Sequence, residues 1–377
     1  MLIGVVTEKE PQETRVAASP ETIRKFIALG AEAVIESGAG IAAGVPDADF
    51  AAAGARIGSA GEALAADILL KVRRPNAAEI GGLKRGALVV SIMDPYGADQ
   101  ALAALAGAGV SAFAMELMPR ITRAQVMDVL SSQANLAGYR AVIDAAAEYG
   151  RALPMMMTPA GTVPAAKAFI MGVGVAGLQA IATARRLGAI VTATDVRPAT
   201  KEQVESLGAK FVAVEDDEFK QAETAGGYAK EMSDAYKAKQ AALIASHIAK
   251  QDIVVTTALI PGRPAPRLVT ADMVRSMRPG SVIVDLAVER GGNCELARAG
   301  EVAISNNGVR IVGNSNVTRL AATASSLYAR NLYAFVETLI DKPAKAIAVN
   351  WDDELVKATL LTRDGAIVHP NFAPKAQ

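Results

Sequence analysis

The sequence predicts an α/β protein with two units, each built on a mostly parallel, twisted sheet. Short apolar segments alternate with helical segments along nearly the whole chain, which is typical of parallel strands with helices on the faces of the sheet. One of these strands is followed directly by a glycine-rich turn with the spacing G-x-G-x-x-G. The length of 377 residues corresponds to two or three domains of about 100–200 residues each.

The first third of the chain begins with a predicted strand, Leu2–Val6, which is followed by a helix. The helix starts at Ser19-Pro20-Glu21, which supplies an N-cap, a proline at the first helical position and an acid in the first turn. Gly30 ends this helix. Further strands are predicted at Ala33–Ile35, Asp67–Val72, Leu88–Met93 and Ser111–Met115, with a helix near Ala98–Leu105.

A long helix, predicted from Ser131 to Tyr149, precedes the second unit. The strand Ala168–Met171 leads into the glycine-rich turn, and the next helix continues to Leu187. Further strands are predicted at Ile190–Thr194, Lys210–Val214, Ile253–Thr257, Val282–Leu286 and Arg310–Val312. The run Met155-Met156-Met157 is interpreted as core packing, because methionine fills irregular gaps.

The C-terminal part has a predicted helix from about Thr318 to Ile340, then three short strand-like pieces near Ala346, Leu355 and Ala366. Three short strands cannot bury a core alone, so we expect this tail to complete the first unit. The expected domains are residues 1–130 with 320–377, and residues 139–313. Long helices near 131–149 and 318–340 would link them.

Composition excludes several classes of function. Hydrophobic residues make up 51% of the chain and charged residues 21%, which suits a sizeable core and is too apolar for disorder. Lys+Arg and Asp+Glu both number 39, so no basic surplus is available for binding nucleic acid or an anionic membrane. One cysteine and two histidines exclude a disulfide framework and Cys/His metal clusters. Both histidines, His247 and His369, are interpreted as structural.

Targeting signals are likewise not expected. The longest uncharged run, residues 168–184, is rich in glycine and shorter than the ~20 apolar residues of a membrane span. The N-terminus has no basic region ahead of its apolar stretch, as a signal peptide would. We therefore expect a globular protein of a reducing compartment with no membrane span of its own.

The glycine-rich turn predicts a dinucleotide site. In such a turn Gly172 would allow the tight bend, Gly174 the approach of a pyrophosphate, and Gly177 the close packing of helix on strand. Asp195 ends the next strand, where a carboxylate can accept ribose hydroxyls and repel a 2′-phosphate, which favours NAD over NADP. Arg197 weakens this preference, because a nearby arginine can bind that phosphate. The alternative is a tight turn without a ligand.

A second polar set lies between the strand Ser111–Met115 and the long helix, in MELMPRITRAQVMDVLSS. Gln125 can donate to and accept from a carboxamide such as that of nicotinamide, and Asp128 can accept from its NH₂ group. Arg120 could hold an acidic or ribose-phosphate group. The alternative is a solvated loop in which Asp128 and Ser131 only cap the helix.

Several long motifs resemble the NAD(H)-binding alpha subunits of proton-translocating nicotinamide nucleotide transhydrogenases. They are MELMPRITRAQVMDVLSSQANLAGYRAVIDAA, FIMGVGVAGLQAIATARRLGAIVTATDVR, ATKEQVESLGAKF, AETAGGYAKEM, TTALIPGRPAP, VIVDLAVERGGNC and TRDGAIVHP. The likeness runs nearly end to end. A chain that stops after HPNFAPKAQ resembles the separate, soluble first portion of the alpha subunit in bacteria that divide the enzyme into three chains.

The resemblance implies two Rossmann-like domains, with NAD(H) bound by the second. It implies direct hydride transfer from NADH to NADP⁺, the NADP(H) being held by a partner domain, and coupling to proton movement through membrane-embedded chains. A homodimer is implied, cytoplasmic and peripheral on the cytoplasmic face of the inner membrane through those partner chains.

The resemblance also assigns roles to residues. The pyrophosphate would be held by Gly172, Val173, Gly174, Val175, Ala176 and Gly177. The adenosine would lie against Asp195, Val196, Arg197, Thr257, Ala258 and Leu259. The nicotinamide would be positioned by Arg120, Gln125 and Asp128, with Ser131 nearby. Gly227 and Tyr228 would lie on a loop, residues 221–233, that closes over the nucleotide.

Alanine dehydrogenase offers the alternative. Arg15 and Lys71 match the substrate-binding arginine and the catalytic lysine of that enzyme, but Asp94 stands at about the position of its catalytic histidine. Oxidation of an amino acid needs a positioned acid–base group, whereas hydride transfer between two nicotinamides needs only orientation and exclusion of water. A third possibility is a non-catalytic NAD sensor.

Overall fold

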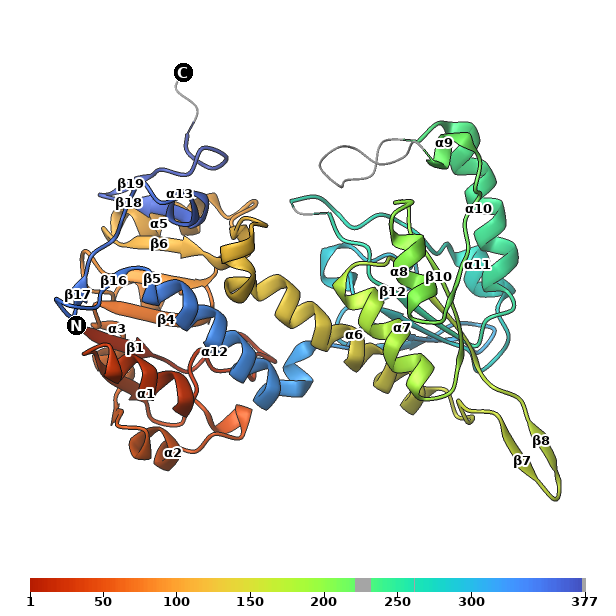
Figure 1. The fold of residues 1–377 in the computed structure, drawn as a ribbon, viewed down its shortest axis with the longest axis horizontal. Helices are drawn as coiled ribbons and strands as arrows, with labels where there is room; N and C mark the ends of the chain where they lie inside the picture. Colours follow the sequence, from red (N-terminus) through yellow and green to blue (C-terminus); the bar gives the residue numbers. More distant parts are fainter. Residues whose placement is uncertain (221–231, 261, 375–377) are drawn as a thin grey trace. The chain divides into compact units, whose positions relative to one another are not determined.

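The computed structural model describes residues 1–220, 232–260 and 262–374 (Figure 1). Contacts between residues divide the chain into two compact units, Met1–Gln133 with Thr318–Gln377, and Ala134–Val317. Each unit has helices on both faces of a mostly parallel sheet, as the sequence predicts. Helix α6 (Val129–Glu148) starts in the first unit and continues into the second.

In the described part of the first unit, eight strands form one sheet in the order β19-β18-β6-β5-β4-β1-β2-β3. The strands are β1 (Leu2–Val5), β2 (Glu32–Glu36), β3 (Arg56–Gly58), β4 (Ile68–Arg73), β5 (Leu88–Ile92), β6 (Ser111–Ala114), β18 (Leu360–Arg363) and β19 (Ala366–Ile367). The first six are parallel to one another, β18 is antiparallel to β6, and β19 is antiparallel to β18. Leu360 of β18 lies opposite Phe113 of β6, so the tail completes this sheet, as predicted.

The tail differs from the prediction at Leu355, which is helical. Helix α13 (Glu354–Thr359) begins there because Asp353 caps it, its carboxylate accepting from the N–H of Leu355 at 2.7 Å. The predicted strands near Ala346 and Ala366 are present as β17 (Ala346–Ile347) and β19. The long helix α12 (Ala321–Glu337) ends before Ile340, because β16 (Ile340–Asp341) pairs with β17.

The predicted start of α1 (Pro20–Ala28) is confirmed. Ser19 accepts from the N–H of Thr22 at 3.2 Å, and Gly30 after the helix has φ +84°. Four more helices lie in the N-terminal part of this unit: α2 (Asp47–Ala52), α3 (Ala60–Leu64), α4 (Ala77–Ile80) and α5 (Asp99–Gly107). Of these four, the sequence predicted only α5, near residues 98–105. Short 3-10 helices are Ile41–Ala43, Met115–Leu117, Thr122–Met127 and Val317–Leu320. The core packs α12 onto the sheet, with the Phe113 and Phe335 rings edge to face at 5.4 Å.

In the described part of the second unit, seven strands have the order β11-β10-β9-β12-β13-β15-β14. They are β9 (Lys167–Met171), β10 (Ile190–Thr194), β11 (Lys210–Phe211), β12 (Ile253–Thr256), β13 (Val282–Asp285), β14 (Val302–Ile304) and β15 (Arg310–Val312). Only β14 is antiparallel among them. The helices are α7 (Val175–Arg186), α8 (Thr200–Ser206), α9 (Asp217–Lys220), α10 (Asp234–Ile248) and α11 (Ala271–Ser276), with a 3-10 helix at Val288–Arg290.

The six parallel strands of each sheet share the doubly wound order 3-2-1-4-5-6 of a Rossmann fold. In that order the connections leave in opposite directions from two neighbouring central strands, which are β1 and β4 in one sheet and β9 and β12 in the other. We call the edge at which the parallel strands end the carboxyl edge. Ligands of such folds bind at the carboxyl edge, at this switch point between the two central strands.

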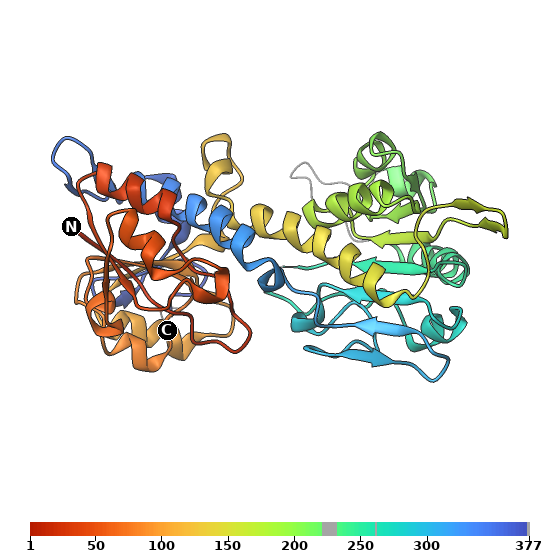
Figure 2. The same cartoon turned by 90° about the horizontal axis from the view of Figure 1, so that it is seen from below.

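The methionine run is exposed, contrary to the core interpretation. It leads into a hairpin of β7 (Met156–Thr158) and β8 (Gly161–Val163) that projects from its own unit (Figures 1 and 2). Met157 is 81% exposed, because the hairpin forms a two-stranded sheet that is separate from the seven-stranded sheet. None of the helices within the described ranges combines the length and apolarity needed to cross a membrane.

Candidate functional site

The glycine-rich turn joins β9 to α7 at the switch point of the second sheet. Gly172 has φ +101°, which a side chain would strain, and its N–H donates to the carbonyl of Thr194 at 2.9 Å. A Cβ on Gly177 would lie 1.9 Å from the carbonyl oxygen of Gly172. The fold therefore requires glycine at both positions, since one makes the bend and the other lets α7 approach the strand.

Gly174 is different, because the fold itself does not require it. Its φ of −79° suits any residue, and a Cβ built there would have no heavy atom within 4 Å. It is the N-cap of the twelve-residue helix α7, whose first N–H groups have no partner within the helix and carry the positive end of its dipole. Open space at this point fits the approach of an anionic group such as a pyrophosphate.

Asp195 follows β10 at the same edge, and its carboxylate is already hydrogen-bonded. It accepts from the N–H of Val173 at 2.7 Å, and from the N–H and Nε of Arg197, both at 2.9 Å. Nη2 of Arg197 also donates to it at 3.0 Å, and the Asp195 side chain is 7% exposed. A ribose hydroxyl would have to replace part of the pairing with Arg197. The charge of Asp195 is also neutralised, which weakens the repulsion of a 2′-phosphate expected from the sequence.

The segment after β12 closes the other side of the switch point. Thr257 Oγ1 donates to the carbonyl of Gly172 at 3.1 Å, which ties this segment to the turn. The fully buried Asn293 accepts from the N–H of Ala258 at 3.0 Å and donates to its carbonyl at 2.9 Å. Sequence reasoning missed Asn293, whose signal was a polar residue in GGNC just after a predicted strand.

Large apolar side chains surround this turn in contact with solvent. Val196 is 55% exposed and Leu259 is 52% exposed, and Val175 is also exposed. Together with Gly172–Gly177, Asp195, Arg197, Thr257 and Ala258, they lie at one edge of the second sheet. Gly227 and Tyr228 lie outside the described residues.

The predicted nicotinamide residues lie in the first unit. Arg120 and Gln125 are exposed, and neither side chain has a hydrogen-bond partner within the described ranges. Asp128 caps α6, accepting from the N–H of Ser131 at 2.8 Å and from its hydroxyl at 2.6 Å. The capping that the alternative interpretation requires is thus present. It uses two of about four acceptor positions of the carboxylate, so Asp128 can still accept from a ligand.

The cations that match alanine dehydrogenase are both buried and paired. Nζ of Lys71, 1% exposed, lies 2.8 Å from Glu79 and 3.3 Å from Glu8. Arg15 donates to Glu13 at 2.7 and 2.8 Å and to Gln133 at 2.8 Å. The charge of each cation is thus already matched by carboxylates of the first unit.

Burial and charge act in opposite directions on the acids of this cluster. Burial raises the pKa of Glu8 despite its contact with Lys71. Burial would also raise the pKa of Glu13, but hydrogen bonds and charge from Arg15 and Arg73 lower it overall. Burial raises the pKa of Glu116, which accepts from the N–H groups of Met93 and Asp94.

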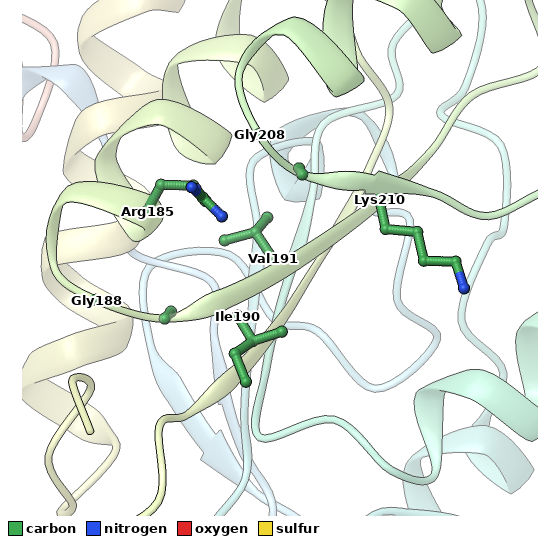
Figure 3. A pocket seen from close by; sticks show the side chains of 8 residues that line it. Arg185, Gly188, Ile190, Val191, Gly208 and Lys210 are labelled. Carbon is green, nitrogen blue, oxygen red and sulfur yellow. The ribbon is translucent and has the colours of Figure 1, made fainter. Parts of the chain in front are cut away.

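A surface hollow of about 520 Å³ lies at the opposite edge of the second sheet (Figure 3). Arg185, Gly188, Ile190 and Lys210 line it, where β10 and β11 begin and where α7 and α8 end. Its lining includes the cations Arg185 and Lys210 beside helix C-termini, which carry partial negative charge. The hollow lies at the other end of the strands from the glycine-rich turn, which follows β9. No group of three or more potential metal ligands gathers anywhere in the described part of the chain.

The histidines have structural contacts. His247 lies 2.8 Å from the Thr192 hydroxyl and edge-on to Phe169, and burial lowers its pKa. His369 accepts from the N–H of Asn371 at 3.2 Å.

Two family models match the chain. The alanine dehydrogenase/PNT N-terminal domain matches residues 4–137, and the alanine dehydrogenase/PNT C-terminal domain matches residues 141–370. A protein of Rhodospirillum rubrum, named as the first part of NAD(P) transhydrogenase subunit alpha, is 54% identical over 98% of both chains. Alanine dehydrogenase of Mycobacterium tuberculosis is 32% identical over 79% of this chain and 75% of the relative.

Solved structures agree with this relationship. A transhydrogenase from Sinorhizobium meliloti is 62% identical, with a TM-score of 0.90 over 98% of this chain and 100% of that chain. An L-alanine dehydrogenase is 28% identical, with a TM-score of 0.80 over 99% of this chain and 98% of that chain. The chain therefore belongs to the alanine dehydrogenase/PNT family of nucleotide-binding, Rossmann-like oxidoreductases, and within it to the transhydrogenase branch.

Proposed function

We propose that this chain is the NAD(H)-binding subunit of a proton-translocating transhydrogenase. Gly174 is the observation that carries the proposal, because it is the one glycine of the turn that only a ligand would require. The bound nucleotides supply the chemistry, which is direct transfer of hydride from NADH to NADP⁺. The protein binds and orients the nucleotide, and it excludes water from the transfer.

The residues at the second carboxyl edge would hold the nucleotide. The N–H groups at Gly172–Gly177 and the start of α7 would bind the pyrophosphate. Asp195, Val196 and Arg197 would contact the adenosine on one side and Thr257–Leu259 on the other, covering the exposed Val196 and Leu259. Arg120, Gln125 and Asp128, with Ser131, would orient the nicotinamide. Gly227 and Tyr228 would belong to a loop that closes over it.

The second nucleotide would come from another subunit. The described residues contain one G-x-G-x-x-G turn, while the corresponding switch point of the first sheet is filled by Glu8 and Lys71. NADP(H) would be held by a domain of membrane-embedded partner chains that also carry the proton channel. This chain would lie in the cytoplasm, peripheral on the cytoplasmic face of the inner membrane.

We also propose a homodimer. The hairpin β7–β8 supports it, because an isolated two-stranded sheet is marginally stable in water and this one exposes Met155, Met156 and Met157. A second copy of the chain would cover these side chains.

A transfer assay tests the proposal. The purified chain should bind NADH but transfer no hydride to NADP⁺ and oxidise no L-alanine. Addition of an NADP(H)-domain protein should give rapid transfer without a membrane. Alanine-dependent reduction of NAD⁺ by the chain alone would instead indicate an amino-acid dehydrogenase. NADH binding with no transfer, even with the partner present, would indicate a sensor.

A further inference from the structure

Asn331 is a buried polar residue in the middle of α12. Its Nδ2 donates to the carbonyl oxygen of Val126 at 2.8 Å, and its Oδ1 accepts from the hydroxyl of Ser132 at 2.7 Å. Both partners belong to the segment 122–132, which carries Gln125 and Asp128. One side chain thus holds this segment at two points, before and after Asp128.

The bond to Val126 fixes a backbone that its own side chain does not anchor. Val126 is 65% exposed, so burial of its side chain cannot determine its position. The 3-10 helix Thr122–Met127 ends here, and its last carbonyl groups lack partners within the helix. The amide of Asn331 satisfies the carbonyl of Val126, one residue from Gln125 and two from Asp128.

A second tie connects the same segment's end to α12. The adjacent Gln133 donates to the carbonyl of Ala324 at 3.2 Å and accepts from Nη1 of Arg15 at 2.8 Å. Arg15 is itself held by Glu13. The first turn of α6 therefore has a fixed position on α12, and Asp128 caps that turn.

We propose that Asn331 is the positioning residue that sets the orientation of Gln125 and Asp128 for hydride transfer. This inference rests on the proposed function, in which these two side chains orient the nicotinamide. Transfer between two rings depends on alignment to within an ångström, so a small shift of the segment would lower the rate without removing the nucleotide.

The test compares Asn331→Asp with Ser325→Ala. Asn331→Asp keeps the size and the acceptor for Ser132 but loses the donor to Val126. Ser325, also buried on α12, accepts from the N–H of Val16 at 3.0 Å, and Val16 lies outside the segment. Hydrogen exchange of residues 122–128 is measured in the nucleotide-free chain. NADH affinity, and transfer to NADP⁺ on the partner domain at saturating nucleotide, are measured beside it.

We expect Asn331→Asp to speed exchange in 122–128 and to lower the maximal transfer rate, each by about tenfold. The dissociation constant for NADH should stay within about twofold, because the binding turn lies elsewhere. Ser325→Ala should change neither quantity. Equal effects of both substitutions, or unchanged exchange in 122–128, would overturn the inference.

Two further variants keep the outcomes distinct. Ser132→Ala, at a partly exposed position, removes the other contact of Asn331 and should act in the same direction if Asn331→Asp does not fold. Gln125→Ala tests the proposed function. If its transfer rate is unchanged, the proposed role of the segment fails, and exchange in 122–128 still decides whether Asn331 holds it.

Discussion

The two sheets have the same strand order but use the same switch point in opposite ways. Between β9 and β12, the chain turns through Gly172–Gly177 and leaves open space in front of a helix N-terminus. Between β1 and β4, the chain instead places Glu8 against Lys71, and both are buried. The carboxyl edge of the second sheet, which we call the open edge, can admit a charged ligand. The carboxyl edge of the first sheet, which we call the filled edge, is occupied by its own charged side chains.

The difference shows that strand order provides a place for a ligand, while the residues after the first strand decide its use. A short glycine turn brings a helix N-terminus to the edge. The longer segment from Glu8 to Arg15 brings the buried carboxylates of Glu8 and Glu13 there, and these pair with the buried cations Lys71 and Arg15.

The largest effect should come from breaking the filled edge. Lys71→Met leaves Glu8 and Glu79 buried without their cation, so the free energy of unfolding should fall by about 3–5 kcal/mol. Denaturant unfolding measures it. The surface pair of Lys84 with Asp67 is the control, and Lys84→Met should cost no more than about 1 kcal/mol. Similar losses of unfolding free energy for the two variants would mean that Lys71 contributes no more to stability than a surface lysine does.

Substitution of Gly174 at the open edge should change the affinity for NADH rather than the stability of the fold. Gly174→Val places a side chain where the pyrophosphate would approach, so the affinity for NADH should fall about 100-fold, or about 2.7 kcal/mol. The melting temperature should change little, because the backbone and the space permit a side chain. Gly177→Ala should instead destabilise the second unit through its contact with the carbonyl of Gly172. Wild-type affinity of Gly174→Val in an NADH fluorescence titration would remove the binding assignment.

A smaller effect on binding should follow at Asp195. Asp195→Asn should weaken NADH binding by about 1.5–3 kcal/mol, the range for a hydrogen bond to a charged group. Because Arg197 would lose its ion pair, the preference for NADH over NADPH should narrow. Asp252→Asn is the control, since that carboxylate accepts from the N–H of Lys167 at the opposite edge. Equal titration curves for wild type and Asp195→Asn would contradict the role of this carboxylate.

The smallest effect concerns pH at the filled edge. Burial raises the pKa of Glu116 above its value of 4.5 in the unfolded chain, so the folded state binds this proton more tightly. The stability of the wild type relative to Glu116→Gln should therefore rise as the pH falls from neutral toward 4.5. Unfolding at several pH values measures this difference.

The exposed Glu62 provides the opposite case. Hydrogen bonds from the Ser59 backbone and from Arg56 lower its pKa to about 2, so its contribution should be constant from pH 7 to 5 and be lost only in stronger acid. A parallel pH dependence of Glu116→Gln and Glu62→Gln would show that burial of Glu116 has no such effect.

Local chemistry made some features of the molecule predictable. Ser19-Pro20-Glu21 starts a helix because a cap, a proline and an acid satisfy a helix N-terminus wherever it lies in a fold. Alternating strands and helices indicated parallel sheets, because neighbouring parallel strands need a crossover connection that is usually a helix. Errors arose where neighbours along the chain do not decide the outcome. Leu355 reads as a strand residue but follows a capping aspartate, and the three methionines read as core but lie on a hairpin.

The sequence by itself determined the two mostly parallel sheets, the glycine turn after β9 and the absence of a basic surplus, because these follow from residue type and short-range spacing. Only the tertiary structure decided which charges pair and which polar side chains hold the site. Asp195 meets Arg197, Asn293 holds Ala258, and Asn331 reaches Val126 across 205 positions of sequence. The physical reason is that a hydrogen bond or ion pair depends on ångström distances between atoms, and for residues far apart in the chain packing alone sets those distances.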